Sequence, residues 1–97
     1  MPMYITLLNY TAQGIKDIKN APNRVAAARR GIEAAGGKLH GFYLTMGLYD
    51  AVTVIEAPSD EAAAAIALAV GAEGNVRGTT LRAFTEEEMA KIVGNLP

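Results

Sequence analysis

The sequence contains no cysteine, which excludes disulfide bonds, zinc–thiolate sites and thiol nucleophiles. It has no excess of basic residues either, and a formal net charge of -1 offers nucleic acid no cationic surface. The longest apolar run, Ala62–Val70, is too short to cross a bilayer. The first residues show no basic segment followed by an apolar one. We therefore expect a cytoplasmic protein with no signal peptide, no nucleic-acid partner and no membrane partner.

Serine and histidine are also scarce. Ser59 is the only serine and His40 the only histidine, so we expect no serine–histidine–acid triad. Ser59 precedes two acids, which is a pattern typical of a helix N-cap. The four methionines are scattered along the chain and fit core filling better than haem or copper binding. We expect no metal and no cofactor.

Apolar residues, in contrast, are abundant. They make up 51% of its 97 residues, and this length fits a single domain over residues 1–97. Much of the apolar content is alanine, which packs closely but buries little area. Because so short a chain has a marginal core, we expect part of its apolar surface to be buried against another subunit.

Hydrophobic periodicity and turn residues predict the order β-α-β-β-α-β, followed by a terminal helix. The predicted strands are Tyr4–Tyr10, Leu39–Met46, Ala51–Glu56 and Asn75–Ala83. The predicted helices are a short piece ending at Lys19, then about Asn23–Ala35, Asp60–Val70 and Glu86–Val93. The expected N-caps are Thr11, Ser59 and Thr85.

This order predicts an α+β fold, the ferredoxin-like split βαβ sheet, with its strands in the spatial order 4-1-3-2. Both long helices then cover one face of the sheet. The central strands nevertheless carry apolar residues at both parities, for example Leu7 beside Leu8 and Val54 beside Ile55. A sheet with one solvated face would alternate apolar and polar residues. We therefore expect a second copy to cover the other face, giving a homodimer or a larger homo-oligomer.

The tight connection between the second and third predicted strands contains a glycine, an aromatic residue and an acid, Gly47-x-Tyr49-Asp50. With this motif the chain resembles the GYD-domain family. The resemblance extends through Tyr4-x-x-Leu7-x-Asn9-Tyr10-Thr11, Gly36-Gly37-Lys38-Leu39, Phe42-Tyr43-x-Thr45, Glu56-Ala57-Pro58 and Gly74-Asn75-Val76-Arg77. It implies the dimeric α/β-barrel fold and a dimer more firmly than any activity, since members of the family are small and largely uncharacterised.

The same hairpin is similar to one in the ligand-binding domain of leucine-responsive regulators, where Gly-x-Tyr-Asp also opens the third strand. Those domains bind small effectors between subunits, and the similarity implies such a site here. The helix-turn-helix half of those regulators has no counterpart in this chain, so the similarity does not extend to DNA binding.

Polar side chains are expected to gather at two rims of the sheet. If the first and third strands run parallel, as we expect, one rim brings together Asn9, Tyr10, His40, Glu56 and Arg77. His40 is a candidate base there, because an unperturbed histidine titrates near neutrality, and Glu56 would orient it. Asn9 or Arg77 would stabilise an anionic intermediate. The alternative, which we favour, makes His40 and Glu56 ordinary strand residues.

The other rim is expected to hold the hairpin Gly47–Asp50 together with Tyr4, Thr45 and Arg82. Asp50 is a candidate base or ligand anchor, and Tyr49 a hydrogen-bonding wall. In the structural alternative, which we favour, Gly47 supplies unusual backbone angles. Asp50 then accepts N–H groups of the turn or pairs with Arg82, and Tyr49 packs.

Three functional hypotheses stay open, because one fold hosts many functions. The first is a small-molecule-binding or sensing homo-oligomer with sites near the subunit contact, and its expected ligand contacts are Tyr10, Arg77 and Arg82. The second is a cofactor-independent enzyme, such as a monooxygenase or isomerase, using His40 with Asn9 and Glu56, or Asp50 with Tyr49. The third is an assembly protein that closes dimers into rings.

Overall fold

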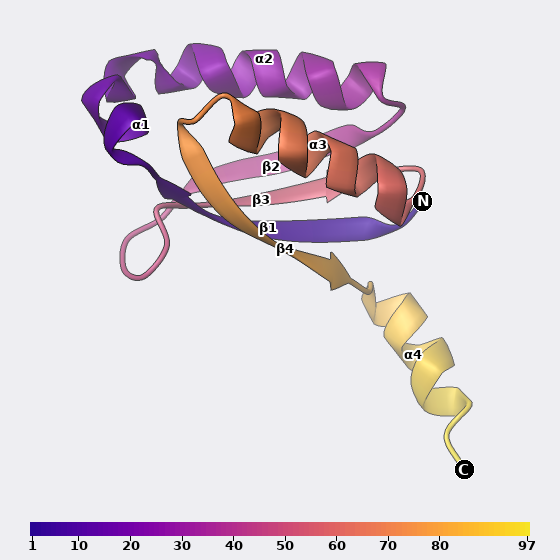
Figure 1. Cartoon of the computed structure of the whole chain (residues 1–97). Helices are drawn as coiled ribbons and strands as arrows, with labels where there is room; N and C mark the ends of the chain where they lie inside the picture. Colours follow the sequence, from indigo (N-terminus) through magenta and orange to yellow (C-terminus); the bar gives the residue numbers. More distant parts are fainter.

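A four-stranded sheet forms one layer of the protein (Figure 1). The computed structural model describes all residues from 1 to 97. The strands are β1 (Met3–Tyr10), β2 (Lys38–Leu44), β3 (Ala51–Glu56) and β4 (Val76–Ala83), in the spatial order β2-β3-β1-β4. The α+β class and this strand order are consistent with a ferredoxin-like fold, as the sequence predicts.

The direction of the central strands corrects one expectation. β1 and β3 are antiparallel, with Tyr4 opposite Ile55 and Leu8 opposite Ala51, so the expected parallel pairing was wrong. The physical reason is the connectivity. A helical crossover makes β2 run the same way as β1, and the tight hairpin then reverses the chain into β3. Consequently the ends of β1 and β2 meet the starts of β3 and β4 at one rim.

Three of the four α-helices begin directly after a capping residue that the sequence predicts. The helical segments are α1 (Ala12–Lys16), a 3₁₀ turn η1 (Ile18–Asn20), α2 (Ala21–Ala34), α3 (Asp60–Ala72) and α4 (Glu86–Gly94). The side chains of Thr11, Ser59 and Thr85 each accept a hydrogen bond from an N–H of the following turn. α2 starts two residues earlier than expected, because Pro22 lies in its first turn, where a missing N–H breaks no helical bond.

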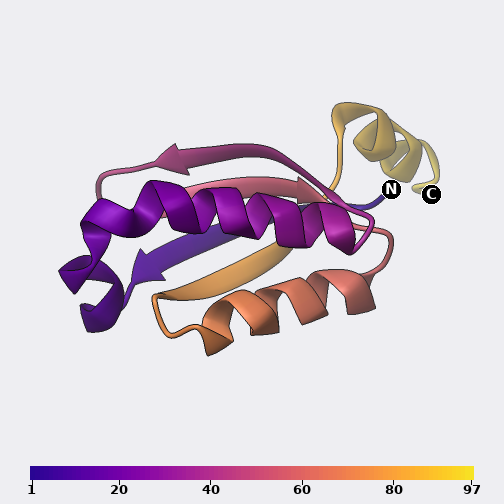
Figure 2. The same cartoon turned by 90° about the horizontal axis from the view of Figure 1, so that it is seen from above.

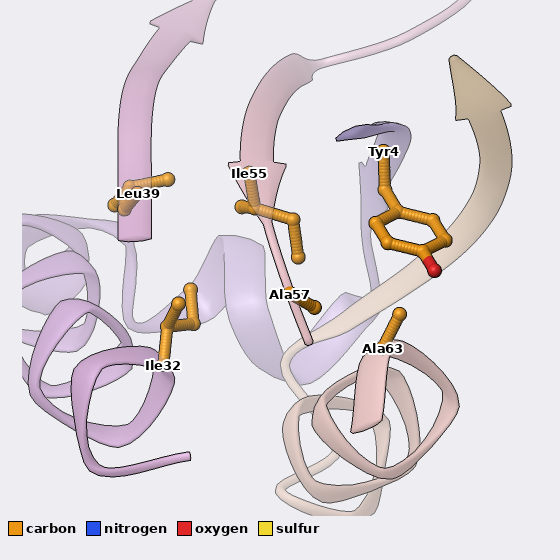
Figure 3. Packing of buried hydrophobic residues seen from close by; sticks show 6 residues of the cluster. All are labelled: Tyr4, Ile32, Leu39, Ile55, Ala57 and Ala63. Atoms are coloured by element: carbon orange, nitrogen blue, oxygen red, sulfur yellow. The ribbon is translucent and has the colours of Figure 1, made fainter. Parts of the chain in front are cut away.

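Helices α2 and α3 lie side by side on one face of the sheet (Figures 1 and 2). Beneath them is a small core made of Tyr4, Ile32, Leu39, Ile55, Ala57 and Ala63. Figure 3 shows Ile32 of α2 pointing towards Ile55 and Leu39, and Ala63 of α3 lying next to the Tyr4 ring. The Tyr4 hydroxyl also donates a 2.5 Å hydrogen bond to Asp60 Oδ1 at the start of α3. This core occupies the rim at which β1 and β2 begin and β3 ends.

No helix covers the other face of the sheet (Figure 1). Because side chains alternate along each strand, this open face carries the residues that do not point towards α2 and α3. Its apolar members are Met3, Ile5, Leu7, Val52, Val54 and Leu81. Leu81 is exposed and the other five are half-buried by their neighbours alone. Only 8 of the 97 residues are buried, so the chain by itself encloses little of its apolar surface.

The β2–β3 hairpin depends on one glycine. Gly47 has φ +113°, which strains any residue with a Cβ, although no atom lies within 4 Å of where that Cβ would be. We expect Gly47→Ala to lower the free energy of unfolding by about 1 kcal/mol or more through backbone strain alone. Tyr49→Phe, which alters a partly exposed side chain in the same turn, should change it by less than about 0.5 kcal/mol. Chemical denaturation of both variants tests this, and equal stabilities would contradict the turn geometry.

The start of α4 has a pH-dependent cap. Glu88 Oε1 accepts the Thr85 N–H at 3.0 Å, while the Thr85 hydroxyl oxygen accepts the Glu88 N–H at 3.1 Å. The hydrogen bond from the Thr85 backbone, helped by the nearby Arg82 charge, holds the pKa of the Glu88 carboxyl below its usual range. The stability that this carboxylate gives to the helix is therefore fully present above its unfolded-state pKa. It is lost as the pH falls through the lower folded-state value.

We therefore expect NMR signals of the first turn of α4 to shift towards unfolded values on acidification, in step with Glu88 titration. Glu88→Gln should abolish this transition, because its amide oxygen accepts the same bond at every pH. Glu87→Gln, which changes the neighbouring acid that takes no part in the capping hydrogen bonds, is the matched control and should preserve the transition. A pH-independent first turn in the unmodified protein would contradict the role of the carboxylate.

Candidate functional site

The layer between the helices and the sheet is incompletely filled. Beyond the core, α2 and α3 stand over the sheet and leave a cavity of about 290 Å³, the helix–sheet cavity. Its roof comes from small and branched residues of the two helices, including Val25, Ala28, Ile66, Ala67 and Val70. Its floor comes from all four strands. Sixteen of the 25 residues that line it are hydrophobic, so the cavity is an apolar site.

Three threonines give the floor of the cavity its polarity. Thr6, Thr53 and Thr80 point from neighbouring strands towards the helices, and the Thr6 and Thr80 hydroxyls are hydrogen-bonded to each other at 3.2 Å. Gly78 adds no side chain to this floor, and a Cβ there would come within 2.9 Å of Thr6 Cγ2. The floor is therefore open, neutral and able both to donate and to accept hydrogen bonds.

No charged side chain reaches the floor of the cavity. The only charged residues that line the cavity are Arg24 and Glu73, both from the helical layer. Arg24 is already engaged, because it forms a 3.2 Å ion pair with Asp17 and donates a 3.3 Å hydrogen bond to the Gly14 carbonyl. A charged ligand would consequently find no free counter-ion on the sheet side of the cavity.

The cavity opens towards the β2 edge of the molecule. A shallower groove there shares Tyr10, Ala21, Val25 and Phe42 with the cavity and continues over Pro22 and Leu44. Tyr10 therefore lies at the junction of the groove and the cavity. It is the only one of the expected site residues that lines the cavity.

The expected grouping of site residues at the two rims was wrong, because it assumed a parallel β1 and β3. Asn9 and Arg77 lie opposite each other at the rim that also holds Tyr10 and the hairpin. His40 and Glu56 lie at the other rim, on the open face, with a distance of 2.9 Å between His40 Nε2 and Glu56 Oε1. The sheet thus separates this pair from the helix–sheet cavity.

Asp50 joins the hairpin to the end of β1. Its Oδ2 accepts the Tyr10 backbone N–H at 2.9 Å, and its own N–H donates to the Leu8 carbonyl at 2.8 Å. Within the hairpin, the Thr45 hydroxyl donates to the Tyr49 carbonyl at 2.6 Å. The aspartate therefore has a structural task next to the cavity mouth, and its acceptor is used by a neighbouring strand rather than by the turn or Arg82.

At the opposite rim, the Arg82 side chain contacts two aromatic rings, a carboxylate and two backbone carbonyls. Its guanidinium carbon lies 4.5 Å from the Phe84 ring centroid and 5.7 Å from that of Tyr4, and its Nη2 is 3.8 Å from Glu88 Oε2. It also donates to the Met3 and Ala83 carbonyls. Nearby, the hydrogen bond to Asp60, followed by burial, raises the pKa of the Tyr4 hydroxyl. These contacts tie the end of β4 to the core.

Comparison with known proteins decides the family. The model of the GYD domain matches residues 4–93 of the 97. The chain belongs to the GYD domain family. No curated protein and no solved structure matches it. None of the helices in this GYD domain is both long and apolar enough to span a membrane, and no three His, Asp or Glu side chains cluster as a metal site would require.

The cavity of this GYD domain was not predicted from the sequence. The predicted site residues are mostly ionisable ones at the strand ends, whereas the floor of the cavity is made by Thr6, Thr53 and Thr80 in the middle of strands. The signal was available: these threonines share the parity of the buried Tyr4 and Ile55, and they face helices rich in alanine. Small helix residues above short strand residues leave unfilled volume.

The bond between Asp50 and Tyr10 can be tested through stability. We expect Asp50→Ala to lower the free energy of unfolding by about 1–3 kcal/mol, because it leaves the Tyr10 N–H without its charged acceptor. Asp50→Asn keeps an acceptor oxygen in place and should lower the free energy of unfolding by clearly less. Chemical denaturation measures both changes, and hydrogen exchange at the Tyr10 amide reports the bond directly. Unchanged Tyr10 exchange in Asp50→Ala would refute this role.

Proposed function

We propose that this GYD domain is a homodimeric binding protein for compact, uncharged and largely apolar molecules, which it holds in the helix–sheet cavity. The observation that carries the proposal is an apolar cavity of about 290 Å³ with a floor of neutral hydroxyl groups. Binding sites for small molecules generally measure about 300–1,000 Å³ and combine apolar walls with a few polar groups. The volume supports a ligand at the small end of that range.

The polar groups narrow the ligand chemistry. Each threonine hydroxyl has one donor and two acceptor sites, so the floor suits a carbonyl or hydroxyl group of the ligand. Burial of a carboxylate or an ammonium group beside Thr6 and Thr80 would leave that charge uncompensated. An aromatic or alicyclic ketone or alcohol fits these requirements. The site lies within one chain, between its own layers, rather than at the expected subunit contact.

The homodimer in this proposal is supported by the open face of the sheet. Ile5, Leu7, Val52 and Val54 form a continuous apolar surface on the central strands, and none of the chain's own helices covers it. A second copy of the same face is the simplest partner, since an isologous contact matches identical patches. Burial of these side chains would offset the small size of the core.

A cofactor-independent enzyme is the second candidate function. It is favoured by one observation, the 2.9 Å contact between His40 Nε2 and Glu56 Oε1, which is how a histidine base is held by a carboxylate. This pair lies on the open face, so its substrate would have to bind between two sheets of a dimer. The helix–sheet cavity contains no comparable base, and this supports binding over turnover there.

Thermal unfolding with matched probes tests the proposed binding. Acetophenone should raise the melting temperature in proportion to the logarithm of its concentration above saturation of the site. Benzoate, similar in size but anionic, should have little effect. Ala67→Leu, which fills the roof of the cavity, should remove the response, and Ala64→Leu on the same helix but outside the cavity should retain it. Equal responses from Ala67→Leu and the unmodified protein would refute binding in this cavity.

A further inference from the structure

Helix α4 has an apolar side with no partner in its own chain. Met89, Ile92 and Val93 recur at the spacing of one helical face, and Leu96 follows just after the end of the helix; each is 49–65% exposed. No residue of α4 is buried. Figures 1 and 2 show the helix extending from the end of β4, on the side of the sheet away from α2 and α3.

The direction of α4 is nevertheless fixed. Its first turn is closed by the Thr85–Glu88 capping box, and Arg82 on β4 pairs with Glu88 at 3.8 Å. A helix of nine residues is marginal in water without tertiary packing. A capped helix that projects a continuous apolar side therefore requires a surface to pack against.

The β2–β3 hairpin is a second apolar projection. Its residues from Leu44 to Tyr49 include no charged side chain, and Met46 and Leu48 are 99% and 88% exposed. Connections of this kind are normally rich in polar residues. The conformation is also held firmly, because Thr45 N–H donates to the Asp50 carbonyl at 2.9 Å and Asp50 is bonded to β1.

The two projections lie at opposite ends of the sheet and on the same side of it. Figure 1 shows the hairpin loop and α4 both hanging below the strands, on the side of the open face. Consider two copies stacked face to face about a two-fold axis that runs across the strands. This operation reverses the strand direction, so each hairpin comes to lie at the end from which the other copy's α4 projects.

We propose that α4 of one copy packs its apolar side against the β2–β3 hairpin of a second copy, twice in each dimer. The inference rests on the homodimer of the proposed function and identifies two segments that form the subunit contact. Both surfaces in this contact are apolar. Ile92 and Met89 of one copy would pack on the hairpin of the other, which has no charged side chain that the contact would bury.

Electrostatics disfavours the other face-to-face arrangement. A two-fold axis along the strands would stack α4 on α4 and bring two acidic first turns together, each with Glu86, Glu87 and Glu88. Like charges brought into such proximity repel. The arrangement across the strands instead places each acidic turn opposite a segment without charge.

Dimer dissociation measured by sedimentation tests the contact. Ile92→Gln and Leu48→Gln should each weaken dimerisation roughly tenfold or more, as expected for central apolar contacts. Both side chains are exposed in the single chain, so folding should survive. Lys91→Gln, on the polar side of α4, is the matched control and should leave dimerisation unchanged. In the double variant, dimerisation should be weakened by less than the product of the two single effects, because the two side chains contact each other across the dimer.

Disulfide trapping gives the arrangement directly, since the native chain has no cysteine. The variant carrying both Leu48→Cys and Ile92→Cys should form a covalent dimer, and neither single variant should. Cross-linking of Ile92→Cys alone would overturn the proposal in favour of the α4-on-α4 arrangement. A dimer that Ile92→Gln and Leu48→Gln leave unaffected would overturn only this inference, whereas a monomeric unmodified protein would also remove the homodimer from the proposed function.

Discussion

The apolar core between the helices and the sheet is confined to one end of the sheet, and the remaining features of the protein depend on this. At this end, Tyr4 reaches across to Asp60 at the start of α3, and Ile32 packs on Ile55. Towards the other end, alanines of α2 and α3 stand above threonines, and neither fills the space between the layers. The same weak packing that leaves a small core also leaves the helix–sheet cavity.

The two faces of the sheet consequently have different uses. The covered face carries the core and the helix–sheet cavity, both made within one chain. The open face carries a continuous apolar surface and, at its margin, the His40–Glu56 pair. This separation would let the proposed binding site and the proposed subunit contact use different side chains of a 97-residue chain.

Local chemistry in the sequence predicts most of the fold. The caps at Thr11, Ser59 and Thr85 are where they were expected, because a short polar side chain before a helical run has one dominant use. The strand order also follows from the alternation of strands and helices. Strand direction was predicted wrongly, and with it the grouping of His40 and Glu56 with Asn9 and Arg77. The cavity was missed because a void is set by what helices and strands together fail to fill, so its signal, threonines at core parity beneath alanine-rich helices, is divided among segments far apart in the sequence.

Tyr10 belongs to two systems at once. Its side chain forms part of the cavity mouth, and its backbone amide is held by the aspartate of the Gly-x-Tyr-Asp turn. A molecule held in the proposed site would contact the ring of the same residue whose amide anchors the hairpin. If its binding changed the hairpin, a contact that restrains the hairpin would, by thermodynamic reciprocity, change the affinity of the site by the same factor. The aspartate of the family motif thus joins the hairpin to a residue that lines the cavity.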